Sequence, residues 1–354
     1  MVIGKMLQRR GVSVAGSTAR GGKSLNTERK KGLILLVCFV GVVVAGLLAG
    51  MYFEQNSASP ARHTASQNVG QLKRVEYEGR TYVEKKAMTS LLLMGTDRTE
   101  KSVSYGARQG GQADFLMLVV IDHNDREIHR LQIDRDTITE VETLGVLGNP
   151  VGTRPMQICL AHSFGSTPEQ NSRFAKKAVE NLLEGISIDD TIVLNMDAIG
   201  AVNSALGGVT VTLEEDLSYA DAAMINGATL RLTERQAEIL LHDRMQLGDG
   251  TNEARMKRQR LYLNAAVETL VSRMKQNAEF MGVFLDALDP YMVASIPRGD
   301  LIAEVNRAYH YTVLPVQSLA GEHAIGADGF VEFHVAQGAT IQWVMETFYK
   351  VDIK

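Results

Sequence analysis

Runs of apolar residues in the middle of the chain predict strands buried on both faces. The segments "TSLLLMG" (89–95) and "DFLMLVVI" (114–121) are almost continuously apolar, which is typical of a sheet covered by helices on both sides. "EIHRLQI" (127–133) alternates apolar and polar positions and predicts a neighbouring strand. "TIVLNM" (191–196) and "GGVTVTL" (207–213) predict two more.

Helical patterns lie between and after these runs. "TPEQNSRFAKKAVENLLEG" (167–185) opens with Thr167 and Gln170 as a capping box and with Pro168 at the first helical position. A second capping box, Thr233 to Gln236, opens the helix predicted in "LTERQAEILLHDRM".

"NEARMKRQRLYLNAAVETLVSRM" (252–274) predicts a long helix. Its apolar stripe consists of Met256, Leu263, Val267, Leu270 and Met274. Arg255, Arg258 and Tyr262 share another face. The C-terminal segment "DGFVEFHVAQGATIQWVMETFYK" (328–350) predicts a strand followed by an amphipathic helix. The alternation of strands and helices indicates an α/β fold, and 88–350 shows no internal repeat or boundary, so one domain is expected.

A stretch of 21 residues without a charge, Leu33 to Phe53, precedes this domain. At roughly 1.5 Å per residue a helix of this length would cross a bilayer core, and it is longer than the apolar part of a cleavable signal peptide, the alternative. We therefore expect a basic cytoplasmic tail (1–31), a transmembrane helix (32–53) and an extracellular linker with a short hairpin (54–87). The basic flank indicates that the tail lies on the cytoplasmic side of the cell membrane and that the domain (88–350) lies outside the cell.

Charge is distributed unevenly along the chain. Residues 1–31 hold eight of the 37 Lys and Arg residues but one of the 41 acids, so the remainder carries an excess of acids. This argues against nucleic acid as a partner. The two cysteines, Cys38 in the predicted span and Cys159 in the domain, leave the domain without an internal disulfide. Cys159 is expected to be a small buried apolar residue rather than a nucleophile.

Four basic residues crowd the start of the long predicted helix, in "GDGTNEARMKRQR". Cations at a helix N-terminus are locally unfavourable unless an anion lies between them. Arg244 ends the preceding helix, and Arg135 follows a strand in "QIDRDT". Because guanidinium groups bind phosphate oxygens in pairs, Arg135, Arg244, Arg255 and Arg258 are candidate pyrophosphate ligands; a solvated basic face is the alternative.

Two aspartates also lie at predicted strand ends, Asp97 after "LLLMGT" and Asp114 at the start of "DFLML". Mg²⁺ binds one or two carboxylates and completes its shell with water and substrate phosphates. Carboxylates and arginines at strand ends together indicate a metal–pyrophosphate site, although an isolated aspartate often only caps a turn.

These residues lie in motifs that resemble the LytR-CpsA-Psr proteins over about 88–350. The motifs occur in order: "LLLMGTD", "QADFLMLVVID", "LQIDRDT", "VENLLEGISIDDTIVLNMDAI", "NSALGGVTV", "LLHDRM", "RMKRQR" and "DGFVEF" with "FYK". The resemblance implies a short cytoplasmic tail, one span, and a three-layer α-β-α domain with a central mixed sheet.

The resemblance also implies an activity. Such proteins transfer a glycopolymer, such as teichoic acid or capsular polysaccharide, from a polyprenyl-pyrophosphate carrier to peptidoglycan by phosphoryl transfer. By position, Asp97 and Asp114 match the aspartates that hold Mg²⁺ (or Mn²⁺), and Asp97 is also a candidate catalytic residue. Arg135, Arg244, Arg255, Arg258 and Gln259 match the residues around the pyrophosphate, and Arg135, Arg255 and Arg258 are the expected catalytic cations.

Two positions depart from the family pattern, which often has arginine at both. Gln112 stands two residues before Asp114, and His242 stands two residues before Arg244. These changes bear on substrate preference more than on the type of reaction. Two other functions stay open: a membrane-anchored sensor that binds lipid-linked polymers without turnover, and a polyprenyl-pyrophosphate hydrolase that uses water as the acceptor.

Overall fold

A six-stranded sheet is the centre of the computed structural model, which describes residues 73–97, 111–145, 149–242, 252–277 and 279–353. The strand order is β11-β8-β3-β4-β5-β12. In chain order the strands are β3 (Met88–Thr96), β4 (Ala113–Asp122), β5 (Glu127–Ile133), β8 (Asp190–Leu194), β11 (Met292–Ala294) and β12 (Thr312–Ser318).

The sheet is mixed. β4 is antiparallel to both β3 and β5, whereas β8 is parallel to β3 and β12 is parallel to β5. All of β4 and most of β3 are buried, which confirms the prediction from their continuous apolar runs. The antiparallel pairing brings the end of β3, the start of β4 and the end of β5 to one edge of the sheet.

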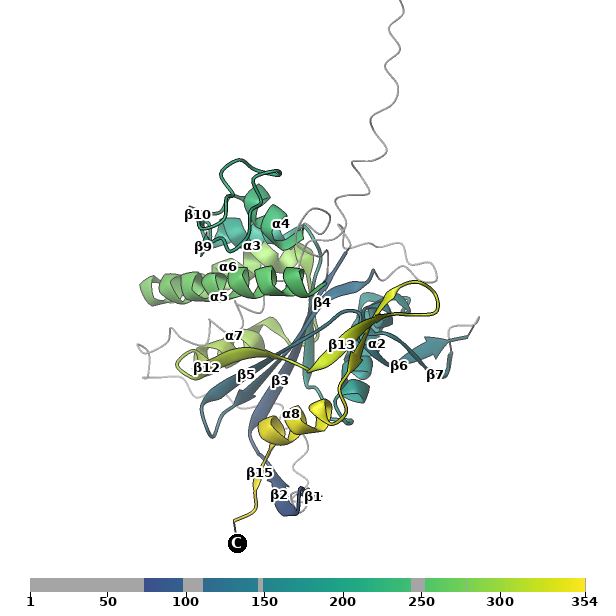
Figure 1. The fold of residues 1–354 in the computed structure, drawn as a ribbon. Helices are drawn as coiled ribbons and strands as arrows, with labels where there is room; N and C mark the ends of the chain where they lie inside the picture. Colours follow the sequence, from purple (N-terminus) through teal and green to yellow (C-terminus); the bar gives the residue numbers. More distant parts are fainter. Residues whose placement is uncertain (1–72, 98–110, 146–148, 243–251, 278, 354) are drawn as a thin grey trace, which may run out of the picture. The chain divides into compact units, whose positions relative to one another are not determined.

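Helices cover both faces of this sheet (Figure 1). On one side lies α2 (Pro168–Leu182). The other side is covered by α3 (Ala198–Ala205), α4 (Glu234–His242), α5 (Asn252–Gln276) and α6 (Phe280–Leu288). The chain is therefore an α/β protein with a central mixed sheet, as predicted. The helix α7 (Arg298–Ala308) connects β11 at one edge of the sheet to β12 at the other.

The predicted helix starts are confirmed by their caps. Thr167 accepts a hydrogen bond from the backbone N–H of Gln170 at 3.2 Å. At α4 the box is reciprocal, because Gln236 N–H donates to the Thr233 hydroxyl at 3.2 Å and Thr233 N–H donates to the Gln236 side chain at 3.0 Å. Each cap satisfies backbone donors that the first helical turn leaves without an internal partner.

Four smaller sheets complete the domain. They are formed by β1 (Arg74–Tyr77), β2 (Arg80–Glu84) and β15 (Tyr349–Val351), by β6 (Ile138–Leu144) and β7 (Pro150–Gln157), by β9 (Thr210–Thr212) and β10 (Thr229–Arg231), and by β13 (Gly321–Ile325) and β14 (Val331–Val335). The short segments η3 (Ile158–Ser163) and η4 (Asp289–Tyr291) and the helix α8 (Ala339–Phe348) are the remaining described elements.

The predicted N-terminal hairpin turns at Glu78 and Gly79, which have φ angles of 46° and 73°. A positive φ at both central residues matches the right-handed twist of the two strands. Its second strand, β2, also pairs with β15 near the C-terminus, so the start and the end of the described chain are joined in one small sheet.

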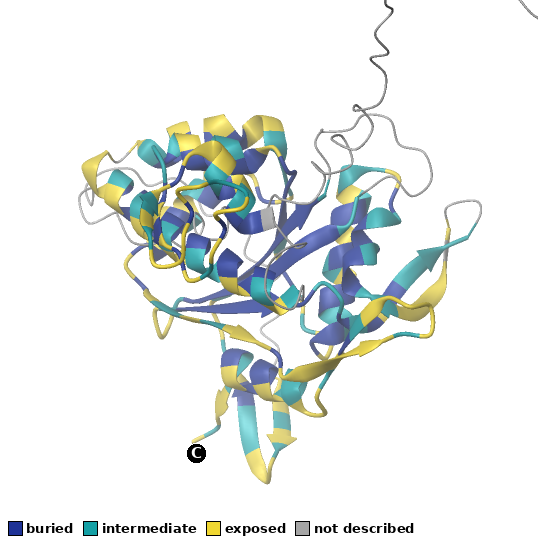
Figure 2. Ribbon diagram, turned by 45° about the horizontal axis from the view of Figure 1, so that its top comes forward, coloured by how far each residue is buried: buried dark blue, intermediate teal, exposed yellow. Residues whose placement is uncertain are grey.

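The core lies between the central sheet and its helices, where Figure 2 shows mostly buried residues. The predicted stripe of α5 is buried throughout, and Cys159 in η3 is fully buried. Burial raises the pKa of the Cys159 thiol to about 12, so its unreactive thiol form dominates at neutral pH, consistent with the prediction that it is not a nucleophile.

The predicted tail (1–31), span (32–53) and most of the linker lie outside the described residues. Within the part that is described, none of the helices combines the length and the apolar character required to cross a bilayer.

Candidate active site

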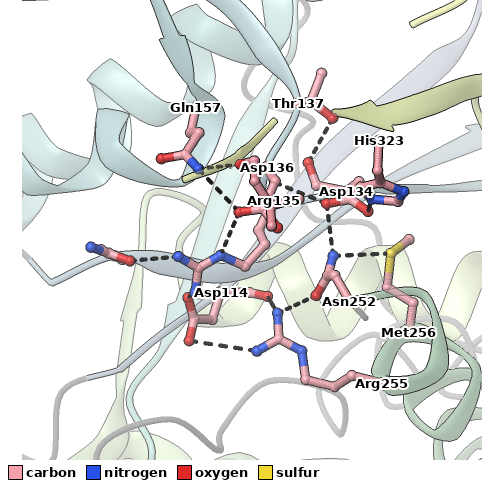
Figure 3. A network of polar contacts seen from close by, with 12 residues as sticks. Asp114, Asp134, Arg135, Asp136, Thr137, Gln157, Asn252, Arg255, Met256 and His323 are labelled. Carbon is pink, nitrogen blue, oxygen red and sulfur yellow. Dashed lines mark hydrogen bonds and ion pairs between the residues drawn. The ribbon is translucent and has the colours of Figure 1, made fainter. Parts of the chain in front are cut away.

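Side chains from four elements meet at the edge of the sheet where β3 and β5 end and β4 begins. Asp97 follows β3 by one residue, Asp114 is the second residue of β4, and Arg135 lies two residues after β5. The first turn of α5 reaches the same edge and contributes Arg255 (Figure 3). We call the group Asp97, Gln112, Asp114, Arg135, Asp136 and Arg255 the sheet-edge cluster.

Asp114 is the centre of this cluster because two arginines face its carboxylate. The Nη1 atom of Arg135 donates to Asp114 Oδ1. The Nη1 atom of Arg255 lies 3.8 Å from Asp114 Oδ2, and its Nη2 atom donates to the Asp114 backbone carbonyl at 3.3 Å. Arg255 is 1% exposed and Asp114 9%, so the charges interact where water screens them little.

Arg135 is held by three acceptors. Its Nη2 atom donates to the Gln112 side-chain oxygen at 2.7 Å, its Nε atom donates to Asp136 at 3.3 Å, and Asp114 holds Nη1. Burial alone would lower the pKa of Arg135, but the neighbouring carboxylates outweigh it and raise the pKa above its ordinary value. These three acceptors fix the guanidinium at the edge of the sheet.

Asp97 lies beside this network. The backbone N–H of Gln112 donates to Asp97 Oδ1 at 2.8 Å, and the Asp97 N–H donates to the Gln112 carbonyl at 3.2 Å. Burial and the nearby Asp114 carboxylate raise the pKa of Asp97. Two neighbouring carboxylates in a buried place are a favourable setting for a divalent cation.

The described part of the chain has no group of three or more His, Cys, Asp and Glu side chains arranged to bind a metal. A magnesium site needs fewer, since one or two carboxylates suffice when phosphates and water supply the other ligands. The charges of the cluster agree with this, because its three aspartates outnumber its two arginines. A pyrophosphate alone would therefore meet negative surroundings, which a divalent cation would offset.

Two of the predicted pyrophosphate ligands face other partners. Arg258 is 4% exposed; its Nη1 atom lies 2.8 Å from Glu215, and its Nε atom donates to the Leu240 carbonyl at 3.0 Å. The side-chain oxygen of Gln259 accepts a hydrogen bond from Gln132 at 3.0 Å. The structure thus brings Asp97, Asp114, Arg135 and Arg255 together, and the pyrophosphate role of Arg258 and Gln259 stays a prediction.

The two remaining sequence predictions lie at the margin of the described chain. Arg244 lies outside the described residues, and the side chain of His242, the last residue of α4, is outside them as well. Gln112, the other departure from the family pattern, is explained by its contacts, because it supplies an oxygen acceptor to Arg135 that an arginine could not supply.

Sequence reasoning missed three neighbours of the cluster: Asn252, Asp134 and His323. Asn252 accepts a hydrogen bond from Arg255 Nη2 and donates to Asp134 at 2.7 Å. Asp134 in turn lies 3.0 Å from the Nε2 atom of His323. Asp134 lies in the segment "QIDRDT", which the sequence analysis singled out for Arg135. Nothing in the sequence links this segment to His323, which lies in the β13–β14 hairpin 189 positions later.

The chain is similar in sequence and in fold to known bacterial proteins. The chain is 24% identical to the polyisoprenyl-teichoic acid–peptidoglycan teichoic acid transferase TagU of Bacillus subtilis over 242 residues, which covers 68% of this chain and 71% of that protein. Among solved structures, gbs0355 of Streptococcus agalactiae matches with a TM-score of 0.60 at 19% identity, covering 73% of this chain and 86% of the other. TagV of B. subtilis matches with a TM-score of 0.56 at 21% identity, covering 74% and 98%.

The structural matches show that the fold is shared. The family itself is shown by its model, which matches residues 49–337 and therefore includes every residue of the sheet-edge cluster. This chain belongs to the LytR_cpsA_psr family.

Proposed function

We propose that this protein transfers a wall glycopolymer, such as teichoic acid or capsular polysaccharide, from a polyprenyl-pyrophosphate carrier to peptidoglycan. Family membership and the name of the B. subtilis relative, which specifies a polyisoprenyl-linked donor and a peptidoglycan acceptor, support the choice of substrates. The observation that carries the chemistry is Arg135, a cation fixed at the sheet edge by three acceptors.

In this proposal the pyrophosphate of the donor binds at the sheet-edge cluster. Arg135 faces oxygens of the transferred phosphoryl group and stabilises the charge that develops there. Arg255 acts from the other side of Asp114, where it fixes the carboxylate and offsets part of its negative charge. Because these groups are held in place before the substrate arrives, little reorganisation opposes the reaction.

Asp97 and Asp114 are the residues that would hold a divalent cation. When bound, Mg²⁺ or Mn²⁺ supplies positive charge to the pyrophosphate oxygens. Asp97 is the better candidate for direct ligation, because no arginine donates to its carboxylate among the described residues, whereas Asp114 is engaged by Arg135.

The bond changes are those of an in-line phosphoryl transfer. A hydroxyl oxygen of the acceptor sugar attacks the phosphorus that carries the polymer, and the bond to the bridging oxygen breaks. The electron pair leaves with the lipid phosphate, and the hydroxyl proton passes to a base. The product is a phosphodiester between polymer and peptidoglycan.

The proposal places the protein in the cell membrane, with residues 1–31 cytoplasmic, residues 32–53 spanning the bilayer and residues 88–350 outside. The lipid-linked donor and the peptidoglycan acceptor are both reached from that side. Reaction of whole cells with an impermeant protease tests the orientation: the domain should be digested and a tag on the tail protected.

The activity is tested with the full-length chain in vesicles, a polyprenyl-pyrophosphate-linked disaccharide, purified peptidoglycan strands and Mg²⁺. We expect covalent transfer that stops with EDTA and returns with Mg²⁺ or Mn²⁺. Arg135→Ala should lower the rate by about 100-fold or more. Arg154→Ala, which removes an exposed arginine of β7, is the matched control and should leave the rate unchanged.

The same assay separates the two alternatives. Release of lipid phosphate and a free sugar phosphate without a peptidoglycan adduct would identify a hydrolase. Donor binding without cleavage would identify a sensor. A transfer rate of Arg135→Ala within a few-fold of the wild-type rate would contradict the proposed chemistry.

A further inference from the structure

A cavity of about 210 Å³ adjoins the sheet-edge cluster. It lies between the end of β5, the first turns of α5 and the β13–β14 hairpin, and its lining includes Gln132, Asp134, Met256, Arg260, His323 and Phe333. The volume is below the roughly 300–1,000 Å³ of pockets that hold a whole small-molecule ligand. A cavity of this size fits a single ring of a longer polymer.

A histidine–aspartate pair lies in the wall of this cavity. Asp134 Oδ2 is 3.0 Å from His323 Nε2, and the Asp134 side chain is 6% exposed whereas that of His323 is 29% exposed. Asp134 Oδ1 also accepts hydrogen bonds from the backbone N–H of Asp136 at 2.9 Å and from Asn252 at 2.7 Å. The carboxylate is therefore fixed by three donors, and the imidazole it orients is open to solvent.

The orientation of the pair determines which nitrogen can accept a proton. A carboxylate only accepts, so the hydrogen of the neutral imidazole lies on Nε2, and Nδ1 is the acceptor. Nδ1 makes no hydrogen bond to any residue within the described ranges. This is the arrangement in which an aspartate holds a histidine in the tautomer needed for general-base catalysis.

The hairpin that carries His323 is tied to the segment that carries Arg135. Phe333 N–H donates to the Asp136 carbonyl at 2.8 Å, and Phe333 forms a bridge with Thr137. The centroids of the Phe333 and His323 rings lie 4.9 Å apart. His323 is thus fixed relative to the strand end that also positions the cation of the proposed transfer site.

Asn252 connects the two sites directly. Its side-chain oxygen accepts from Arg255 and its nitrogen donates to Asp134, so one side chain spans the distance between the sheet-edge cluster and the histidine pair (Figure 3). A group in the cavity would therefore lie next to a pyrophosphate bound at the cluster.

We propose that this cavity binds the acceptor sugar of peptidoglycan and that His323 is the base for its hydroxyl group. The inference rests on the proposed transfer function. The lining suits a sugar ring, because the Phe333 ring offers an apolar surface while Arg260 and His323 offer hydrogen-bond partners to hydroxyls.

The step balances without another reactant. Nδ1 of His323 takes the proton of the acceptor hydroxyl as the oxygen bonds to phosphorus and the bond to the lipid phosphate oxygen breaks. The imidazolium formed is stabilised by Asp134, and its proton is later lost to water. Asp134 is a positioning residue in this scheme, whereas His323 contacts the reacting atom.

The test compares two histidines of the same hairpin. His323→Gln removes the proposed base, and His334→Gln removes the histidine of β14 that pairs with Glu332 at 2.9 Å on the exposed surface. The full-length chain is assayed in vesicles with the polyprenyl-pyrophosphate-linked disaccharide and peptidoglycan strands, and the donor affinity is measured separately in the absence of strands.

We expect His323→Gln to lower kcat for transfer by about 100-fold, at the lower end of the usual contribution of a general base, with donor Kd within twofold of the wild type. Addition of imidazole to His323→Ala should restore part of the rate. His334→Gln should transfer at the wild-type rate. Transfer by His323→Gln within threefold of the wild type, or an equal loss in both variants, overturns the role of His323 while leaving the proposed function intact; a wild type that transfers nothing overturns both.

Discussion

Two arginines three residues apart on α5 have different surroundings. Arg255 faces Asp114 at the edge of the central sheet, whereas Arg258 pairs with Glu215, which follows β9, and with the carbonyl of Leu240 in α4. Both side chains are almost completely buried, at 1% and 4% exposure. The basic residues that are close in sequence are thus divided between the sheet-edge cluster and the interior of the helical layer.

Helical spacing alone therefore does not distinguish an arginine of the sheet-edge cluster from one that is buried in the helical layer. Positions i and i+3 lie on neighbouring parts of a helix surface, but a buried helix contacts several elements, and neighbouring side chains can enter different ones. The partner carboxylate decides the role, and the partners of these two arginines come from segments about 100 residues apart in sequence.

The largest effect is expected when the two partner carboxylates are exchanged for alanine. Asp114→Ala leaves the guanidinium groups of Arg135 and Arg255 facing one another, and losing one member of a buried ion pair costs about 3–5 kcal/mol. It should also abolish transfer. Glu215→Ala should cost less stability, because its side chain is 26% exposed, and should leave transfer within a few-fold. Thermal unfolding and the transfer assay measure both.

The control for this pair is Asp286→Ala, which removes an exposed ion pair with Arg298. Exposed pairs contribute about 0–1 kcal/mol, so its melting temperature should hardly change. Equal losses of transfer in Asp114→Ala and Glu215→Ala would show that Arg255 and Arg258 do not differ in function.

The arginines themselves provide the next test. Arg255→Gln should lower transfer by about 100-fold, whereas Arg258→Gln should lower it by about 10-fold at most and mainly destabilise the fold. The rate is measured per folded molecule at a temperature well below both melting points. The opposite ranking would favour the sequence-based prediction that Arg258 binds the pyrophosphate.

A smaller effect is expected for Gln112→Arg, which restores the residue common in the family. The change removes the acceptor of Arg135 Nη2 and adds a second cation, which should cost about 1–3 kcal/mol in the absence of an anion. Inorganic pyrophosphate with Mg²⁺ should then raise the melting temperature more for the variant than for the wild type. Equal shifts would show that position 112 does not face the anion.

The smallest effect concerns pH. Because the pKa of Asp97 is raised in the folded protein, the folded state holds this proton more tightly than the unfolded state. The stabilisation is present below the ordinary pKa of about 3.9 and is lost as the pH rises through the folded value. Asp97→Asn should therefore be less sensitive to pH above about 4 than the wild type.

Denaturation in buffers without metal measures this difference. Added Mg²⁺ should offset the loss in the wild type near neutral pH but not in Asp97→Asn. A variant with an unchanged pH profile would show that Asp97 does not carry the proton.

The central sheet was predictable because its signal is local. Continuous apolar runs identified β3 and β4, and the capping boxes placed the starts of α2 and α4 at the observed residues. The meeting of Asp97, Asp114 and Arg135 follows from this, since three antiparallel strands that are adjacent in sequence bring alternate ends to one edge.

Other parts of the site depend on contacts that no local pattern encodes. β13 is exposed at every position, so it has no apolar alternation to reveal it, and His323 reaches Asp134 only through the return of the chain after β12. The partner of Arg258 was also hidden, because Glu215 is one of several acids in a polar segment. Both contacts, His323 with Asp134 and Arg258 with Glu215, depend on packing between segments that are far apart in the sequence.

The small sheet that joins β2 to β15 has a practical consequence for engineering. β3 begins directly beyond this sheet and ends at the sheet-edge cluster, and nine residues of strand extend for about 30 Å. A fluorophore, affinity handle or surface tether attached after β15 would hence lie about one strand length away from the sheet-edge cluster. Single-molecule pulling from β15 should load the β1–β2 hairpin before it loads the sheet-edge cluster.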